Sequence, residues 1–372
     1  MNLTRRDFAR LAASASASTL LRAPGFAQAA PAKKIRYCAV GLGRISLDHF
    51  MPGTRMSSLG QMTAVVSGHP DKAKKIAAQY GIPETSIYNY ENYDRIRDNP
   101  NIDAVYIGLP NSMHAEYTIR AAQAGKHVLC EKPMADTVAD CEAMIAASKK
   151  AGKLLMIGYR CQLDATTLHA RKVVQSGVLG KLQAIESANG FNMPPGEWRL
   201  NRALAGGGPL MDVGIYSLNA CRFLTGEEPT HFSAFSSVVD HDGRFDQVEE
   251  NLSWTMKFPS GLVAACNTTY GANMEGLIRI HGSRGVLTLT NFGYSNIHFN
   301  AHIDGLKQGD PGHDIAAAEQ GHDPAQFVVE SDYFSKCILH NTTPGPSGEE
   351  GLRDIAIMMK IYESAARNNA MA

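Results

Sequence analysis

The first half of the chain alternates between short apolar runs and longer amphipathic stretches. The apolar runs predict strands covered on both faces. They lie at residues 35–40, 62–67, 104–109, 127–130 and 154–157. The amphipathic stretches predict helices, of which three end at a glycine. These helices are expected from near Leu47 and at residues 71–80, 113–124 and 137–150. This alternation predicts an α/β fold with a parallel sheet and right-handed crossovers.

After residue 158 the pattern changes to successive strands joined by short turns. Strands are expected at residues 182–187, 233–239, 251–258, 261–269, 277–281 and 285–290. This succession predicts a large, open, mostly antiparallel sheet. Helices at residues 165–176, 214–224 and 352–366 would cover one face of it. Residues 300–325, rich in Gly, His and Asp, are expected to form an ordered loop. No metal site is expected there, because the spacing matches no standard ligand set.

Residues 1–29 have the pattern of a twin-arginine export signal. Arg5 and Arg6 precede Phe8, a mildly apolar run follows at residues 11–21, and residues 27–29 resemble a cleavage site. An ordinary secretory signal or a disordered tail is the alternative. The twin-arginine route carries proteins that have already folded. We therefore expect a periplasmic protein that receives any cofactor before export.

Composition narrows the classes of partner. Lys+Arg and Asp+Glu both number 36 in the 372 residues, so the formal net charge is zero. This balance gives no support for nucleic acid or an anionic membrane as partner. Beyond the amino-terminal segment, no apolar run is long enough to span a bilayer. The cysteine count of seven is odd and includes no CxxC pair, so we expect no disulfide framework.

A glycine-rich turn joins the first expected strand to its helix. The segment Gly41-Leu42-Gly43-Arg44-Ile45-Ser46 matches the dinucleotide-binding fingerprint in its required context. The first glycine permits the tight turn, and the second lets backbone N–H groups approach a pyrophosphate. Ser46 is small enough for the third position. These residues predict a Rossmann domain at residues 34–157.

The end of the second expected strand bears on the choice of nucleotide. An NAD site places an acidic residue there to bind the ribose hydroxyls. This chain has Ser67 instead, followed by Lys72 in the next helix. A hydroxyl and an ammonium can hold a 2′-phosphate, so NADP is the expected cofactor. The alternative is that Lys72 is a surface residue without this role.

Three residues are candidates for the chemistry. Lys132 follows Glu131 at the carboxyl end of a strand, where open α/β sheets bind ligands. The alternative is a solvated ion pair. Asp212 and Tyr216 follow a glycine-rich segment at residues 206–208, and their spacing of four puts them on one helical face. A carboxylate and a phenol can bind a sugar hydroxyl and move its proton, although a capping Asp and a core Tyr would give the same pattern.

Together these motifs resemble the Gfo/Idh/MocA oxidoreductase family, over nearly all of residues 34–367. Further stretches that carry the resemblance are residues 109–116, 156–160, 198–200 and 348–351. Most members have histidine where this chain has Tyr216, whereas periplasmic glucose–fructose oxidoreductases also have tyrosine. The chain therefore most resembles that branch, and an aldose–aldose oxidoreductase or a related sugar oxidoreductase is equally compatible. The chain departs from this branch in one respect. Only residues 30–34 lie between the expected export signal and the first strand, where glucose–fructose oxidoreductases carry a long proline-rich arm.

The resemblance implies a Rossmann domain followed, at residues 158–372, by an α+β domain that binds substrate. It implies that the sheet of this second domain pairs subunits into a homodimer or tetramer. Tyr216 would be the general acid/base, Lys132 its electrostatic partner, and Asp212 the residue that orients a substrate hydroxyl. Further cofactor contacts are implied for Tyr90, Leu109, Asn111, His114, Glu131, Lys132, Arg160, Trp198 and Arg199.

The expected activity is oxidation of an aldose at C1 to its lactone. The hydride would pass to a second sugar from NADPH that stays bound, in a ping-pong cycle. Two other enzymes of the superfamily stay open, namely a sugar dehydrogenase with dissociable NAD(P) and an NAD-dependent glycosidase. A catalytically silent sugar sensor is a third alternative. Ser67 and Lys72 oppose the glycosidase, and intact Lys132, Asp212 and Tyr216 oppose the sensor.

Overall fold

The computed structural model describes residues 33–293, 296–307, 310–317 and 325–370. The expected export signal at residues 1–29 lies outside this part of the chain. From Lys34 onward the chain forms one compact unit, which is built on two sheets. None of the helices among the described residues is long and apolar enough to cross a bilayer.

The first sheet has six parallel strands in the order β3-β2-β1-β4-β5-β6. The strands are β1 Ile35–Val40, β2 Gly60–Val66, β3 Ile87–Tyr88, β4 Ala104–Ile107, β5 His127–Cys130 and β6 Leu155–Ile157. The strand order reverses between β1 and β4, which is where open α/β sheets bind ligands. The predicted Rossmann fold is confirmed.

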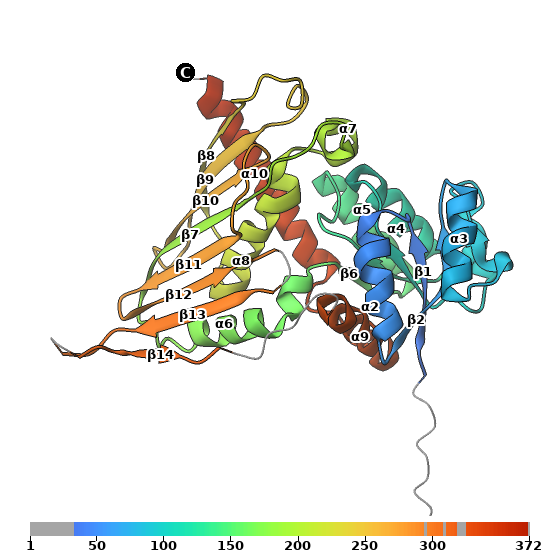
Figure 1. Ribbon diagram of the computed structural model, residues 1–372, viewed down its shortest axis with the longest axis horizontal. Coiled ribbons are helices and arrows are strands. Elements are labelled where there is room, and N and C mark those ends of the chain that lie inside the picture. Colours follow the sequence, from blue (N-terminus) through green and yellow to red (C-terminus); the bar gives the residue numbers. More distant parts are fainter. Residues whose placement is uncertain (1–32, 294–295, 308–309, 318–324, 371–372) are drawn as a thin grey trace, which may run out of the picture. The chain divides into compact units, whose positions relative to one another are not determined.

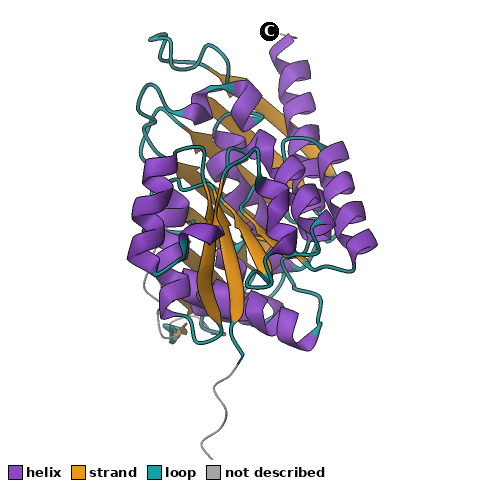
Figure 2. Ribbon diagram, turned by 90° about the vertical axis from the view of Figure 1, so that its right-hand side faces the viewer, coloured by secondary structure: helices purple, strands orange, loops and turns teal. Residues whose placement is uncertain are grey.

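Helices cover both faces of this sheet (Figure 2). They include α2 Met51–Met56, α3 Pro70–Tyr80, α4 His114–Gln123, α5 Val138–Ala151 and α9 Ala325–His340. Successive strand residues point to opposite faces, so Val105 and Tyr106 enter different hydrophobic clusters. Phe327 and Phe334 of α9 join the cluster of Tyr106. Helix α9, which lies near the end of the chain, therefore packs on the first sheet, and packing does not divide at residue 157.

The second sheet has eight strands in the order β14-β13-β12-β11-β7-β10-β9-β8. The strands are β7 Leu182–Gly190, β8 His231–Ser237, β9 Asn251–Lys257, β10 Val263–Thr269, β11 Leu277–Gly282, β12 Gly285–Thr290, β13 His298–Ile303 and β14 His313–Ile315. Every pair is antiparallel except β7 with β10, so the predicted, mostly antiparallel sheet is confirmed. The expected loop at residues 300–325 was wrong in part, because β13 and β14 extend the sheet there.

Three helices cover one face of the second sheet (Figure 1), namely α6 Ala165–Gln175, α8 Ile215–Thr225 and α10 Gly348–Ala370. Strand β9 shows the consequence, because its side chains alternate between buried and exposed. Leu252, Trp254 and Met256 are buried, whereas Ser253, Thr255 and Lys257 are exposed. No described residue therefore covers the second face at β9.

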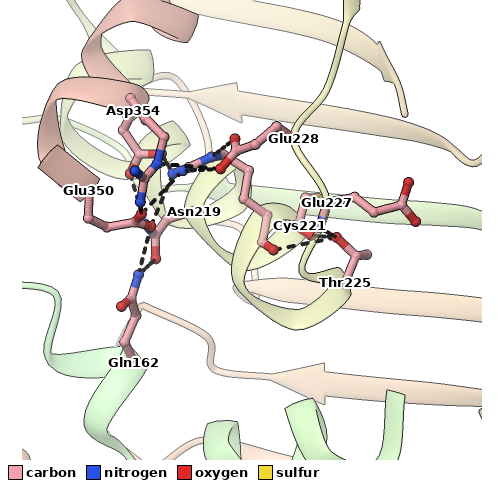
Figure 3. A network of polar contacts seen from close by, with 10 residues as sticks. Gln162, Asn219, Cys221, Thr225, Glu227, Glu228, Glu350 and Asp354 are labelled. Atoms are coloured by element: carbon pink, nitrogen blue, oxygen red, sulfur yellow. Dashed lines mark hydrogen bonds and ion pairs between the residues drawn. The ribbon is translucent and has the colours of Figure 1, made fainter. Parts of the chain in front are cut away.

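A buried polar network ties α8 and α10 to the segment Arg160–Leu163 (Figure 3). Arg222 of α8, only 3% exposed, forms ion pairs with Asp354 and Glu350 of α10. Asn219 donates a hydrogen bond of 2.8 Å to Asp354, and Gln162 donates one of 2.9 Å to Asn219. This network fixes the helix that carries Tyr216 relative to the segment that carries Arg160.

Candidate functional site

A cavity of about 750 Å³ lies where the first sheet's strands end. Its wall includes Gly41 after β1, Ser67 after β2, Gly108 after β4 and Glu131 after β5. All predicted site residues except His114 line it. They are Gly41, Leu42, Gly43, Arg44, Ile45, Ser67, Lys72, Tyr90, Leu109, Asn111, Glu131, Lys132, Arg160, Trp198, Arg199, Asp212 and Tyr216.

The glycine turn forms an open cradle at one end of the cavity. Gly41 has a φ of +85°, and a Cβ there would lie 2.6 Å from the Gly108 carbonyl oxygen. By contrast, no atom lies within 4 Å of the place where a Cβ of Gly43 would stand. Buried Ser46 donates a hydrogen bond of 2.6 Å to the Gly41 carbonyl and so holds the turn. This cradle fits the pyrophosphate of a dinucleotide.

The helix after the cradle differs from the expectation. A π-helix at Ile45–Phe50 comes first, and α2 continues it. No side chain caps this start. Short π-helical turns are frequent at functional sites.

The end of β2 gathers the residues that would read the 2′ position of the ribose. Ser67 is 4% exposed, and its hydroxyl accepts the backbone N–H of His69 at 3.1 Å. The Tyr90 ring covers Gly68, where a Cβ would lie 3.1 Å from it. Lys72 and His69 line the same part of the wall. His69 was not singled out from the sequence, although it sits between two predicted residues.

Lys132 and Asp212 form an enclosed ion pair, which excludes the alternative of a solvated pair. The Lys132 Nζ lies 3.2 Å from Asp212 Oδ1 and donates to the Asp212 backbone oxygen at 2.6 Å. Their side chains are only 11% and 14% exposed. Burial opposes charge on Asp212, but Arg199 and Lys132 outweigh it and hold the pKa of Asp212 well below its usual range. Burial likewise opposes charge on Lys132, but Tyr216 and Asp212 raise its pKa.

The second oxygen of Asp212 has two further donors. Arg199 Nε lies 3.0 Å from Oδ2, and the Tyr270 hydroxyl donates to the same atom at 3.0 Å. A carboxylate has about four acceptor positions, so room remains for a substrate hydroxyl. Tyr270 was missed from the sequence, because it follows an ordinary strand pattern and belongs to no motif.

Two cations face the Tyr216 phenol. Arg160 donates to its oxygen at 2.7 Å, and the Lys132 Nζ lies 4.7 Å from the ring centroid. Two positive charges therefore lie beside this one phenol. The backbone of Gly293 covers the ring, since a Cβ there would lie 2.8 Å from it. Gly293 has a φ of +90°, so glycine suits the position in both space and conformation.

His114, which was predicted to contact the cofactor, does not line the cavity. Its ring is 1% exposed and lies outside the cavity wall. Nδ1 and Nε2 each lie 2.9 Å from a backbone oxygen, those of Pro133 and Leu109. Burial lowers the pKa of His114, although both oxygens oppose that shift. His114 therefore fixes two stretches of backbone behind the cavity.

The arrangement can hold a dinucleotide and exchange a proton beside it. The Tyr216 oxygen, beside Arg160 and Lys132, is placed to exchange a proton with a bound hydroxyl as a general acid/base, and ionised Asp212 can orient that hydroxyl. Among the residues that the structure describes, no group of three or more His, Cys, Asp or Glu side chains is placed to hold a metal ion.

Comparison with known proteins adds the family. Residues 35–159 match the family model "Oxidoreductase family, NAD-binding Rossmann fold", and residues 167–288 match "GFO/IDH/MocA C-terminal domain". The chain is similar to the crystal structure of aldose-aldose oxidoreductase from Caulobacter crescentus complexed with glycerol. That match has 44% identity and a TM-score of 0.85, and it covers 90% of this chain and 98% of that one.

Two curated relatives are more distant. The D-xylose 1-dehydrogenase (NADP(+)) of Haloarcula marismortui is 29% identical over 343 residues, which cover 91% of this chain and 93% of the relative. The 1,5-anhydro-D-fructose reductase of Ensifer adhaerens is 25% identical over 344 residues, covering 90% and 97%. The matches to both domains and to the crystal structure show that this chain belongs to the Gfo/Idh/MocA oxidoreductase family.

Proposed function

We propose that this protein is an NADP-dependent sugar oxidoreductase that oxidises an aldose at C1 and passes the hydride to a second sugar. The observation that carries the proposal is the placement of Tyr216, Arg160, Lys132 and Asp212 in one cavity with the glycine cradle. The similarity to an aldose–aldose oxidoreductase supports sugars as substrates.

In the first half of the cycle, Tyr216 acts as the general base and takes the proton of the C1 hydroxyl. The C1 hydrogen leaves with its electron pair, so the cyclic aldose becomes a lactone. Asp212 accepts a hydrogen bond from a substrate hydroxyl and fixes the ring against the phenol. When bound in the cradle, the nicotinamide cofactor supplies the hydride acceptor.

In the second half, Tyr216 returns its proton to the carbonyl oxygen of a second sugar, which receives the hydride at carbon. The two sugars use the same groups in succession, so the kinetics should be ping-pong. No proton is gained or lost over the whole cycle.

We propose NADP as the nucleotide on the basis of Ser67, His69 and Lys72 at the end of β2. Among the residues that line the cavity, none of the carboxylates comes from this strand end. A relative whose name specifies NADP(+) supports the choice.

The proposed location is the periplasm, on the evidence of the twin-arginine pattern in residues 1–29. Outside the cytoplasm a lost cofactor could not be replaced from a free pool. Retention for hours requires a dissociation rate of about 10⁻⁴ per second. With an association rate of about 10⁶ M⁻¹s⁻¹, the dissociation constant must be on the order of 10⁻¹⁰ M.

We further propose that two or four copies associate through the open face of the second sheet. This face exposes Phe235 at 60% and Val263 at 41% beside the polar residues of β9. Sedimentation of the purified protein tests the proposal, and a monomer at micromolar concentration would contradict it.

The function is tested on protein purified from the periplasm without added nucleotide. Denaturation should release about one NADP(H) per chain, and the native protein should reduce it when mixed with an aldose in a single turnover. Released NAD together with cleavage of a glycoside would indicate the glycosidase instead. No nucleotide and no oxidation after NADP is added would contradict the proposal.

A further inference from the structure

Arg160 donates three hydrogen bonds, all to neutral acceptors. Nη1 donates to the Tyr216 hydroxyl at 2.7 Å, Nη2 to the Gly293 carbonyl at 2.8 Å, and Nε to the side-chain oxygen of Gln326 at 3.1 Å. It forms no ion pair with any carboxylate in the described ranges. An arginine stays charged in proteins, and an enclosed charge is costly without a partner. The only acceptor among these three that can itself become an anion is the Tyr216 oxygen.

Gln326 stands between Arg160 and a carboxylate. Its side chain is 3% exposed at the start of α9. While Oε1 accepts from Arg160, Nε2 donates to Asp164 Oδ2 at 2.9 Å. The other Asp164 oxygen caps α6 by accepting from the backbone of Thr166 at 2.9 Å and of Thr167 at 3.2 Å. A guanidinium on one side and a carboxylate on the other determine which way the amide points.

Other charged groups face this pair from several elements. Lys132 and Asp212 lie on the Tyr216 side. Glu131, which accepts from Tyr106 at 2.8 Å, and Glu330 of α9 lie near Arg160. Burial and the neighbouring Glu131 raise the pKa of Glu330 well above its usual range, and both its oxygens are buried without a hydrogen-bond partner. Burial thus disfavours charge on Glu330, and in the described part of the chain it forms no ion pair with Arg160.

We propose that Gln326 is a positioning residue that keeps Arg160 from pairing with Asp164 and directs its charge to the Tyr216 oxygen. Without the amide, Asp164 Oδ2 would lose its donor and could attract the guanidinium. The phenolate would then lose a cation that stabilises it. The inference rests on the proposed function, in which Tyr216 accepts the proton, but the geometry of the four side chains stands by itself.

The direct test is a spectrophotometric titration of Tyr216. Tyrosinate absorbs differently from tyrosine, so the difference between wild type and Tyr216→Phe reports this one phenol. The substitution Gln326→Met keeps the volume of the side chain and removes both hydrogen bonds. We expect the midpoint of the difference titration to rise by about one pH unit, as for loss of one nearby cation. Gln326→Ala serves if the methionine variant does not fold.

A second arm asks whether Asp164 is the competitor. Asparagine still caps a helix but carries no charge, so adding Asp164→Asn to Gln326→Met should reverse at least half of the shift. Independent, additive effects would mean that the residues do not compete. Ser335→Ala is the matched control, since it removes a buried hydrogen bond of 2.9 Å from α9 to Tyr37 and should leave the midpoint unchanged.

The outcomes separate this inference from the function. An unshifted midpoint in Gln326→Met, or a shift that Asp164→Asn does not reduce, would overturn the role of Gln326. The titration needs neither sugar nor nucleotide, so it can succeed even if the protein oxidises no sugar. If the protein does oxidise sugars, the pH at which single-turnover oxidation rises should move upward in Gln326→Met together with the titration midpoint. The KM for the sugar should change less than twofold.

Discussion

The Tyr216 oxygen receives a hydrogen bond from one cation, Arg160, and its ring lies near a second, Lys132. Substitution of Tyr216 with Phe removes the proton acceptor and keeps the ring. Positioned proton transfer commonly contributes about 10²–10⁴-fold in rate. We therefore expect turnover with sugars to fall by this factor while the nucleotide stays bound, as measured by release on denaturation.

Tyr270→Phe is the matched comparison, because it removes a hydroxyl of the same cavity that donates to Asp212. It should reduce turnover about tenfold or less, since Arg199 and Lys132 still hold the carboxylate. Equal losses in the two variants would argue against a special role for Tyr216.

The proposed preference for NADP over NAD can also be tested at single residues. Ser67→Asp should place a negative charge against a 2′-phosphate and shift the preference toward NAD, and Lys72→Ala should weaken NADP alone. We expect each to change the ratio of the two affinities by about tenfold or more, as for one charged hydrogen bond. Calorimetric titration of nucleotide-free protein measures this.

Lys75→Ala provides the control, because Lys75 is exposed on α3 and lies outside the cavity wall. If Ser67→Asp and Lys72→Ala leave the ratio as it is in this control, another part of the site reads the phosphate.

Motifs predicted most of the site because their spacing is local. Gly41 and Gly43 are fixed by one turn, and Asp212 and Tyr216 by one helical repeat. Tyr270 and Gln326 reach the site from distant segments, so no local pattern marks them. His114 lies inside a motif, yet its ring turns inward to two backbone oxygens, which only the folded chain reveals.

At the scale of elements, α9 shows why one helix escaped prediction. Its buried face includes Gln326, Glu330, Ser331 and Ser335. A helix that buries polar residues lacks the apolar period on which prediction depends. By contrast, β1, β5 and β12 were placed from apolar runs or regular alternation.

The hydrogen bond of His127, at the start of β5, to the residue before β6 makes the stability of the fold depend on pH. Its Nδ1 accepts the backbone N–H of Leu154 at 3.0 Å, and burial, aided by Lys153, lowers its pKa to about 4. The unfolded value is about 6.5, so the unfolded chain binds more protons between these values. The stability that His127 contributes is present above about pH 6.5 and is lost as pH falls toward 4, by about 3 kcal/mol.

His127→Asn keeps an acceptor and cannot titrate. Urea unfolding at several pH values should therefore show a shallower loss of stability below pH 6.5 than in wild type. His340→Asn, at an exposed position, should follow the wild-type curve. Parallel curves for His127→Asn and wild type would refute this account of the histidine.

Arg222 holds the network of α8 and α10 together. Replacement by Met leaves Asp354 and Glu350 buried beside Glu228 with one cation fewer. Removing one partner of a buried ion pair typically costs about 3–5 kcal/mol. We expect a loss of that size in the free energy of unfolding by urea.

Arg284→Met is the control, because Arg284 is exposed and its side chain donates to the Gly177 carbonyl at 2.9 Å. Its cost should be within about 0.5 kcal/mol. A similarly small cost for Arg222→Met would mean that the network contributes little.

At the scale of the whole molecule, residues from both halves of the chain line one cavity. The ends of β1, β2, β4 and β5 supply the cradle, while Asp212, Tyr216 and Tyr270 come from the second half of the chain. Order along the chain predicted the two sheets separately. The way α9 returns to the first sheet depends on packing between segments far apart in sequence.

The central claim is that one cofactor stays bound and carries a hydride between two sugars. Its most direct test uses gel-filtered protein, an aldose deuterated at C1, an unlabelled second sugar and no added nucleotide. The account predicts lactone and reduced sugar in equal amounts, with the deuterium in the reduced sugar. No product without added NADP, or deuterium found only in free NADPH once it is added, would contradict the account and indicate a dissociable dehydrogenase.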